Sequence, residues 1–284
     1  MALAIARRPR PTGRVSIPDQ YTHGHQESVL RSHRWRTAEN SAGYLLSALA
    51  PGQRLLDVGC GPGTITIDLA ARVAPGEVIG LDRSEGVIEQ AREAARASEA
   101  TNVTFRTGDI YALDYEDASF DVVHAHQVLQ HLTDPVAALR ELRRVARPGG
   151  LVAVRDADYA AMTWHPPSPG LDDWLALYHE VTAANHAQAD AGRRLLSWAR
   201  DAGYDPAGIV STAGSWCFAT PQDRVWWAEL WAERSLSSDF ATQAIAHGLA
   251  DDVALEHLAD SWRAWGSAED GWFAVLHGEI LARV

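Results

Sequence analysis

The chain has 284 residues, 46% of them hydrophobic and 22% charged, which is the composition of an ordinary globular protein. Its formal net charge of −12 argues against a general nucleic-acid or membrane-surface binder, because phosphate groups favour clustered basic residues. All 25 basic residues are arginine, which excludes chemistry that needs a lysine: Schiff bases, pyridoxal-phosphate attachment and the P-loop.

Cysteine content and hydropathy indicate the compartment. Cys60 and Cys217 are the only cysteines, too few for a disulfide framework or a cysteine-ligated zinc ion. The sequence contains no run of 18 apolar residues, the length needed to cross a membrane. Its N-terminal arginines follow a short apolar piece, which reverses the order of a secretory signal. We therefore expect a cytoplasmic protein with a disordered tail over residues 1–18 and a single domain over 19–284.

Residues 20–50 are predicted to be helical, with Tyr21, His25 and Val29 spaced one turn apart. Tyr21 and His25 would then lie on one helical face. A helix before the first strand can reach the ligand edge of the sheet and close over a site. A plain amphipathic helix that packs on the sheet is the alternative.

Residues 54–70 predict a strand, a tight turn and a helix, because a short apolar run gives way to glycines and then resumes with helical periodicity. Gly59, Gly61 and Gly63 remove side chains where the backbone must turn and lie against a ligand. The helix start that follows points unpaired N–H groups at the same place. The turn therefore predicts a nucleotide-like ligand.

Two details separate this turn from the dinucleotide fingerprint G-x-G-x-x-G. Thr64 stands where the third glycine would be needed. Asp57 places a carboxylate just before the first glycine, where it would repel a pyrophosphate and attract a cationic amino group. The ligand is therefore expected to carry positive charge here.

The sequence LLDVGCGPG over residues 55–63 resembles motif I of the class I S-adenosylmethionine-dependent methyltransferases, of the ubiquinone/menaquinone-methylase-like type. The resemblance covers about residues 40–160. It implies S-adenosyl-L-methionine as the cofactor. It also implies an α/β fold with a Rossmann-like, doubly wound, seven-stranded sheet that is mostly parallel with an antiparallel last strand.

Two further acids follow predicted strands. The strand over 78–81 ends at Asp82, whose carboxylate can accept two ribose hydroxyls; a helix cap is the alternative, although Ser84 is itself a capping residue. The strand over 102–106 leads to Asp109, for which the resemblance implies a contact with the adenine amine and a Gly-Asp turn is the alternative.

The fourth predicted strand, 119–125, runs into HQVLQHLTDP over 126–135, which resembles the family's fourth motif. His126 comes just past the strand, where open α/β sheets bind ligands. A structural role suits His131 better than catalysis. Metal binding through these histidines is disfavoured, because no carboxylate cluster at ligand spacing accompanies them. The cofactor-binding residues implied by the resemblance are Tyr21, Asp57, Gly59, Gly61, Gly63, Asp82, Arg83, Gly108, Asp109, Ile110, His126 and Gln127.

The later chain completes the predicted sheet and adds helices. A helix over 136–146 and a strand over 151–155 continue the alternating pattern of a parallel sheet, and strands are also expected over 208–220 and 272–284. Helical insertions at about 160–190 and 221–268 are predicted to form a lid over a core at about 40–160. Most of the 11 tryptophans follow residue 170, suited either to enclosing an aromatic acceptor or to filling the core of the lid.

The expected reaction is methyl transfer to a small apolar or aromatic acceptor, with no nucleic-acid or membrane partner; a homodimer stays open. Positioning and exclusion of water can supply much of the catalysis. Where a base is needed, His25, His126 and His165 are the candidates, in that order. The alternatives are a non-catalytic S-adenosylmethionine-binding scaffold or regulator, and a nicotinamide-dependent oxidoreductase, which Asp57 and Thr64 disfavour.

Overall fold

The computed structural model describes residues 18–24 and 26–284, and the strands in this part of the chain form one sheet. The spatial order is β3-β2-β1-β4-β5-β8, and both β7 and the short β6 pair with β8. The strands are β1 (Leu55–Val58), β2 (Val78–Asp82), β3 (Val103–Thr107), β4 (Phe120–His126), β5 (Ala146–Ala157), β6 (Thr163–His165), β7 (Ile209–Phe218) and β8 (Trp272–Arg283).

The sheet is parallel from β3 to β5, and β8 runs antiparallel between β5 and β7. Apart from the three-residue β6, this is the predicted seven-stranded, mostly parallel sheet with an antiparallel last strand, and the predicted fold class is confirmed. β5 begins before the predicted residue 151 and continues to Ala157, so its end reaches further along the ligand edge than expected.

Most of the described α-helices begin at a residue whose side chain caps the first turn. The side chains of Ser84, Asp134 and Thr220 each accept a hydrogen bond from the backbone N–H three residues later. No helix in the described residues is both long and apolar enough to cross a membrane. The α-helices are α1 (Glu27–Arg34), α2 (Ala38–Leu46), α3 (Thr64–Val73), α4 (Glu85–Ala97), α5 (Pro135–Val145), α6 (Pro169–Ala184), α7 (Leu195–Asp201), α8 (Pro221–Ser237), α9 (Asp239–Ala246) and α10 (Asp252–Gly266).

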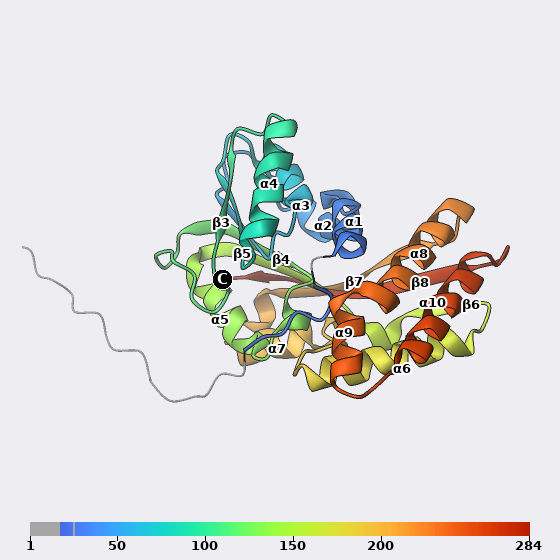
Figure 1. Cartoon of the computed structure of the whole chain (residues 1–284). Coiled ribbons are helices and arrows are strands. Elements are labelled where there is room, and N and C mark those ends of the chain that lie inside the picture. Colours follow the sequence, from blue (N-terminus) through green and yellow to red (C-terminus); the bar gives the residue numbers. More distant parts are fainter. Residues whose placement is uncertain (1–17, 25) are drawn as a thin grey trace, which may run out of the picture.

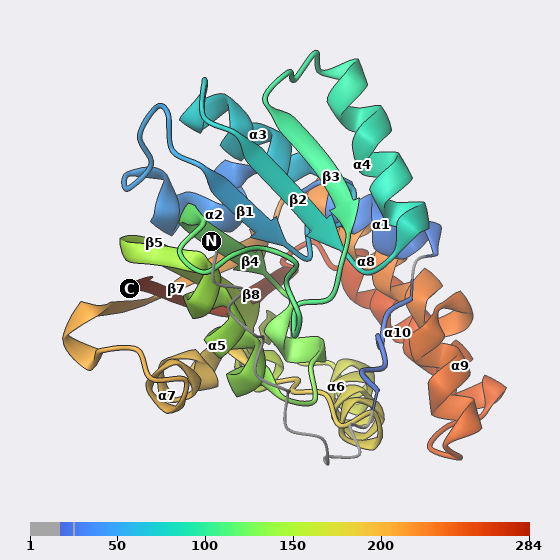
Figure 2. The same cartoon turned by 90° about the vertical axis from the view of Figure 1, so that its left-hand side faces the viewer.

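Helices cover both faces of the sheet, because successive residues of a buried strand point to opposite layers. Leu55 of β1 packs in one core with α2 and α3, whereas Leu56 packs in another with α5 and α7. Figure 2 shows α3 and α4 on one side of the strands and α5 and α7 on the other. The carboxyl-terminal ends of β1–β4 are left as the edge where a ligand can enter.

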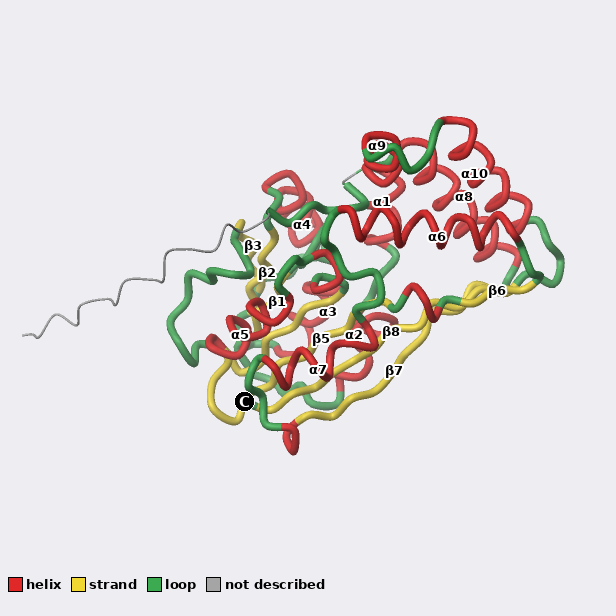
Figure 3. The backbone as a smooth tube through the Cα atoms, turned by 90° about the horizontal axis from the view of Figure 1, so that it is seen from below, coloured by secondary structure: helices red, strands yellow, loops and turns green. Residues whose placement is uncertain are grey.

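A separate hydrophobic core lies among the late helices. Figures 1 and 3 show α6, α8, α9 and α10 gathered on the side of the sheet where β6 lies. Trp174, Trp231 and Trp262 are fully buried there, and the Trp174 ring centroid is 4.5 Å from Trp231 and 4.8 Å from Trp262. Several late tryptophans therefore fill a helical core, as one of the two interpretations predicted.

The N-terminal segment differs from the prediction, because residues 20–24 are not helical. Tertiary contacts hold this stretch: the Gln243 side chain donates to the Tyr21 carbonyl (3.1 Å), and the Asn185 side chain donates to the Thr22 hydroxyl (3.2 Å). Helix begins only at α1, so the expected shared helical face of Tyr21 and His25 is wrong. His25 itself and the tail over 1–17 lie outside the described residues.

Candidate active site

A cavity of about 1350 Å³ lies at the carboxyl-terminal ends of β1–β4. Its wall has two parts. We call the part built by the loops that follow β1–β4 the cofactor half. The acceptor half is the part built by residues 21–36, the chain after β5, and side chains from β7, α8 and β8.

The glycine loop shapes the cofactor half. Gly59, Gly61 and Gly63 all have positive φ (72°, 55° and 85°), a backbone region that side chains disfavour. A Cβ at Gly61 would meet no atom closer than His33 Nδ1 at 3.7 Å, so the chain leaves open space above this residue. Gly63 differs from its prediction: it does not line the cavity, and a Cβ there would press on Phe105, so it permits close packing of α3 on the sheet.

Asp57 lines the cavity, but its carboxylate is already bound inside the fold. One oxygen accepts from the Thr66 hydroxyl (2.5 Å) and the other lies 2.7 Å from His124 Nδ1. The carboxylate is thus fixed at the end of β1 with little freedom to turn toward a ligand. It contributes negative charge at a fixed position in the site, and its predicted contact with a cationic amino group stays a prediction.

Asp82 connects the second strand to the glycine loop. Its carboxylate accepts hydrogen bonds from Gly61 N (3.1 Å) and Ser84 N (3.0 Å), while the Ser84 side chain caps α4. The side chain is half-buried and lines the cavity, which leaves lone pairs for further donors. The cap interpretation of the sequence therefore belongs to Ser84, as expected.

The other predicted cofactor residues that lie in the described part of the chain also line the cavity. Asp109 is exposed at the end of β3, and its carboxylate accepts from Tyr111 N (2.9 Å). Gln127 has a positive φ of 53°, unusual for a residue with a side chain. Lining residues that match the prediction are Tyr21, Asp57, Gly59, Gly61, Asp82, Arg83, Gly108, Asp109, Ile110, His126 and Gln127.

His126 is buried at the boundary between the two halves, and neither ring nitrogen has a hydrogen-bond partner among the described residues. Burial holds the pKa of His126 well below its ordinary value, and the charge of Arg155 acts in the same direction. The imidazole is therefore neutral near pH 7. It is available to a ligand both as a donor and as an acceptor.

The acceptor half is aromatic and basic. Tyr159, Trp216, Trp227 and Trp231 line it, so some late tryptophans enclose space as well as filling the helical core. The cations in it are Arg36 and Arg234, on segments far apart in the sequence. Sequence reasoning expected the stretch over residues 21–36 to reach the acceptor pocket, but it gave no individual role to these arginines or to His23 and His33. The only local signal was the run of basic and aromatic residues over 31–36.

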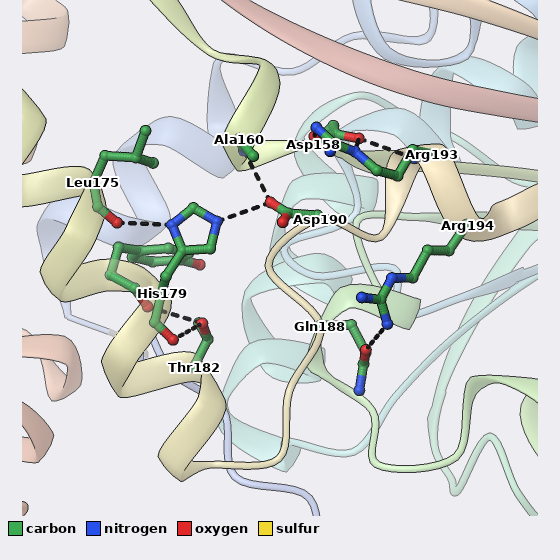
Figure 4. A network of polar contacts seen from close by, with 10 residues as sticks. Asp158, Ala160, Leu175, His179, Thr182, Gln188, Asp190, Arg193 and Arg194 are labelled. Atoms are coloured by element: carbon green, nitrogen blue, oxygen red, sulfur yellow. Dashed lines mark hydrogen bonds and ion pairs between the residues drawn. The ribbon is translucent and has the colours of Figure 1, made fainter.

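Polar contacts hold the two residues that flank Tyr159 in the sequence, Asp158 and Ala160 (Figure 4). Asp190 accepts from Ala160 N (2.8 Å), and its carboxylate also lies 2.9 Å from His179 Nε2. On the other side of Tyr159, the Asp158 carboxylate is paired with Arg193. The network fixes the chain that follows β5 and so fixes the Tyr159 ring.

The structure bears on the sequence expectations for two further histidines. His165 is exposed on β6, lies 3.1 Å from Asp270 and does not line the cavity, so it cannot serve as the base. His131 does line the cavity, where burial and Arg36 lower its pKa to about 3. Among the residues with described positions, no group of three metal-ligating side chains occurs.

The buried histidines predict loss of stability in acid. Burial holds the pKa values of His23, His126 and His277 well below 6.5, their value when unfolded. Their stabilising contribution is therefore present above pH 6.5 and lost as the pH falls. Between pH 7.5 and 5.5 the three together lose about 4 kcal/mol, and His33 and His131, whose pKa values burial also lowers, add to this loss. Asp156 acts oppositely, because burial raises its pKa to about 7, and offsets about 2 kcal/mol.

We therefore expect the free energy of unfolding, from urea titrations, to be at least about 2 kcal/mol lower at pH 5.5 than at pH 7.5. His126→Gln should reduce this loss, whereas substitution of the exposed His257 should leave it unchanged. Equal or greater stability at pH 5.5 would contradict the account of the buried histidines.

Comparison with known proteins agrees with the geometry. A family model described as a methyltransferase domain matches residues 49–204. The chain is 38% identical over 269 residues to an uncharacterized methyltransferase of Schizosaccharomyces pombe, an alignment that covers 92% of this chain and 95% of the relative.

Two further similarities are more limited. The chain is 38% identical over 128 residues to the demethylmenaquinone methyltransferase of Lactococcus lactis, covering 45% of this chain and 48% of that protein. A crystal structure of a putative methyltransferase from Bacillus halodurans has a TM-score of 0.55 at 18% identity, covering 84% of this chain and 96% of that chain, and shows likeness of fold alone. The protein therefore belongs to the class I S-adenosylmethionine-dependent methyltransferases, with distant similarity to the demethylmenaquinone enzymes.

Proposed function

We propose that this methyltransferase transfers the methyl group of S-adenosyl-L-methionine to a small aromatic acceptor. The observation that carries the proposal is the single cavity that joins the glycine loop to a wall of tryptophan and tyrosine. Its volume of about 1350 Å³ exceeds that of a usual single-ligand pocket, about 300–1,000 Å³, and leaves room for donor and acceptor together.

The cofactor half suits the donor in shape and charge. The open space above Gly61 accommodates a ligand that lies against the backbone, and Asp82 offers lone pairs at the end of β2. Asp57, Asp82 and Asp109 make this half acidic, which favours a cationic ligand over a dinucleotide pyrophosphate. We assign Arg83, Gly108, Ile110 and Gln127 to the surrounding contacts.

The donor supplies a methyl group on a sulfonium, and the leaving group is neutral. The chain therefore has to orient the acceptor and keep water away, for which a wall of rigid aromatic side chains is suited. His126 is assigned the contact with the nucleophile: as a neutral imidazole it accepts a hydrogen bond from an acceptor hydroxyl or amine. Its low pKa makes it a weak base, so orientation is its larger contribution.

Transfer of a labelled methyl group tests this function. The wild-type enzyme, supplied with labelled S-adenosylmethionine and a panel of hydroxylated and amino-substituted aromatic compounds, is expected to label at least one of them. His126→Phe should reduce kcat more than it raises KM, because the orienting hydrogen bond is lost. Tight cofactor binding without transfer to any compound would instead support the scaffold alternative.

A further inference from the structure

We propose that the acceptor carries a carboxylate or an equivalent anionic group, which binds to Arg234 and His23 at the deep end of the acceptor half. The proposal rests on the proposed function and adds the charge of the acceptor to it. It is argued from buried hydrogen-bond donors that have no partner inside the protein.

Arg234, on α8, is 4% exposed and lines the cavity. Its Nη2 donates to the Ser32 hydroxyl (2.5 Å), and its Nε has no partner. No carboxylate in the described part of the chain forms an ion pair with it. Arg31, on α1, is by contrast paired with Glu233 of α8 at 3.0 Å. A buried cation without a counterion is costly unless a ligand supplies the charge.

His23 provides a second donor beside Arg234. Its Nε2 lies 3.2 Å from the Tyr159 hydroxyl and 3.0 Å from the Tyr178 hydroxyl. Each tyrosine hydroxyl can donate to Nε2, and with Nε2 as the acceptor we assign the ring proton to Nδ1. Burial keeps the pKa of His23 well below its ordinary value, so the ring is neutral. Nδ1 is buried without a partner and therefore offers an unpaired N–H.

Both donors lie against Trp231. The Arg234 Cζ is 4.9 Å from the centroid of the Trp231 ring, and the His23 ring centroid is 5.8 Å from it. An anion that meets both N–H groups would gain charge-assisted hydrogen bonds in a dry environment. The aromatic body attached to that anion would then lie against the tryptophan wall.

The distribution of charge along the cavity supports an anionic group in the acceptor half. The cavity-lining acids are Asp57 and Asp82 near the ends of β1 and β2, Asp109 and Asp134 after β3 and β4, and Asp19, which accepts from Thr133 N (2.7 Å). Among the described residues, no carboxylate lines the acceptor half. The second cation there, Arg36, donates to Gln127 at the boundary (2.7 Å), where it can serve the carboxylate of the donor itself. The proposal therefore rests on Arg234.

A matched pair of probes tests the inference. 2-Naphthoate and 2-naphthamide share one aromatic body and differ in charge. Calorimetric titration of the wild-type protein, with and without saturating S-adenosylhomocysteine, is expected to give at least about tenfold tighter binding of the acid than of the amide. Arg234→Met should reduce this preference to below about threefold, Arg234→Lys should retain part of it, and Arg31→Met should leave it unchanged.

A second variant tests the contribution of His23. His23→Phe should weaken naphthoate more than naphthamide, because the hydrogen bond to a carboxylate is charge-assisted, and this tests the second donor without altering Arg234. An acid that binds no tighter than the amide, or not at all, to the wild-type protein would overturn the inference. The inference would also be overturned if folded Arg234→Met kept the full preference for the acid over the amide. If Arg234→Met does not fold, the same result in folded His23→Phe would overturn it. Failure of S-adenosylhomocysteine to bind would contradict the proposed function and not this inference. The ratio of the naphthoate and naphthamide affinities, measured without S-adenosylhomocysteine, still reports the anion site.

Discussion

Gly61→Ala is expected to weaken binding of S-adenosylhomocysteine by about thirtyfold while the chain stays folded. The added methyl group would point into the open part of the cavity, where no protein atom lies closer than 3.7 Å, so it would displace ligand and not protein. Overlap of one methyl group with a well-packed ligand costs about 2 kcal/mol, which corresponds to that factor in the dissociation constant.

Gly52→Ala is the matched control for backbone strain. Gly52 also has a positive φ, 86°, and open space around its Cβ, but it does not line the cavity. Both variants should lose a similar amount of stability, about 1–2 kcal/mol from the left-handed backbone, and only Gly61→Ala should lose cofactor affinity. Equal affinities in the two variants, measured by calorimetry, would show that the ligand does not lie against Gly61.

Asp82→Ala is expected to weaken S-adenosylhomocysteine binding by about a hundredfold, or about 3 kcal/mol. The variant loses the proposed acceptor of the ribose hydroxyls and leaves the N–H groups of Gly61 and Ser84 without their present partner. Asp82→Asn keeps one acceptor oxygen, so its affinity should fall between those of the wild-type protein and Asp82→Ala. The measurement is again a calorimetric titration, with unfolding followed in parallel.

A helix cap elsewhere controls for the loss of an acidic hydrogen-bond acceptor. Asp251 accepts from Ala254 N at the start of α10, away from the cavity. Asp251→Ala should cost about 1 kcal/mol of stability and leave the affinity unchanged. If Asp82→Ala binds the ligand as tightly as Asp251→Ala does, the ribose assignment is wrong.

The sheet and the cofactor half could be predicted because their signals are local. A buried strand, its turn and the next helix are consecutive in the sequence, and the ends of parallel strands meet at one edge whatever the rest of the chain does. Asp82 and Asp109 could therefore be placed at the site without any knowledge of long-range contacts. The packing of Gly63 on Phe105 could not be predicted, because periodicity does not reveal which glycine faces the cavity and which faces the sheet.

The acceptor half could not be predicted because its parts come together only on folding. His23, Tyr159 and Arg234 are more than 70 residues apart in the sequence, and no spacing rule connects them. Helical spacing over residues 20–24 gave the wrong structure for a related reason: contacts with Asn185, just after α6, and with Gln243 of α9 override local propensity there. The division of the chain into a core and an acceptor lid stays a prediction.

A crystal structure of the complex with S-adenosylhomocysteine tests the central claim most directly, that one cavity holds the donor at the strand ends and the acceptor against the aromatic wall. The account predicts ribose hydroxyls within hydrogen-bond distance of the Asp82 carboxylate, backbone contact at Gly61, and the sulfur facing His126 and the acceptor half. A ligand bound elsewhere, or one whose sulfur faces away from that half, would contradict it.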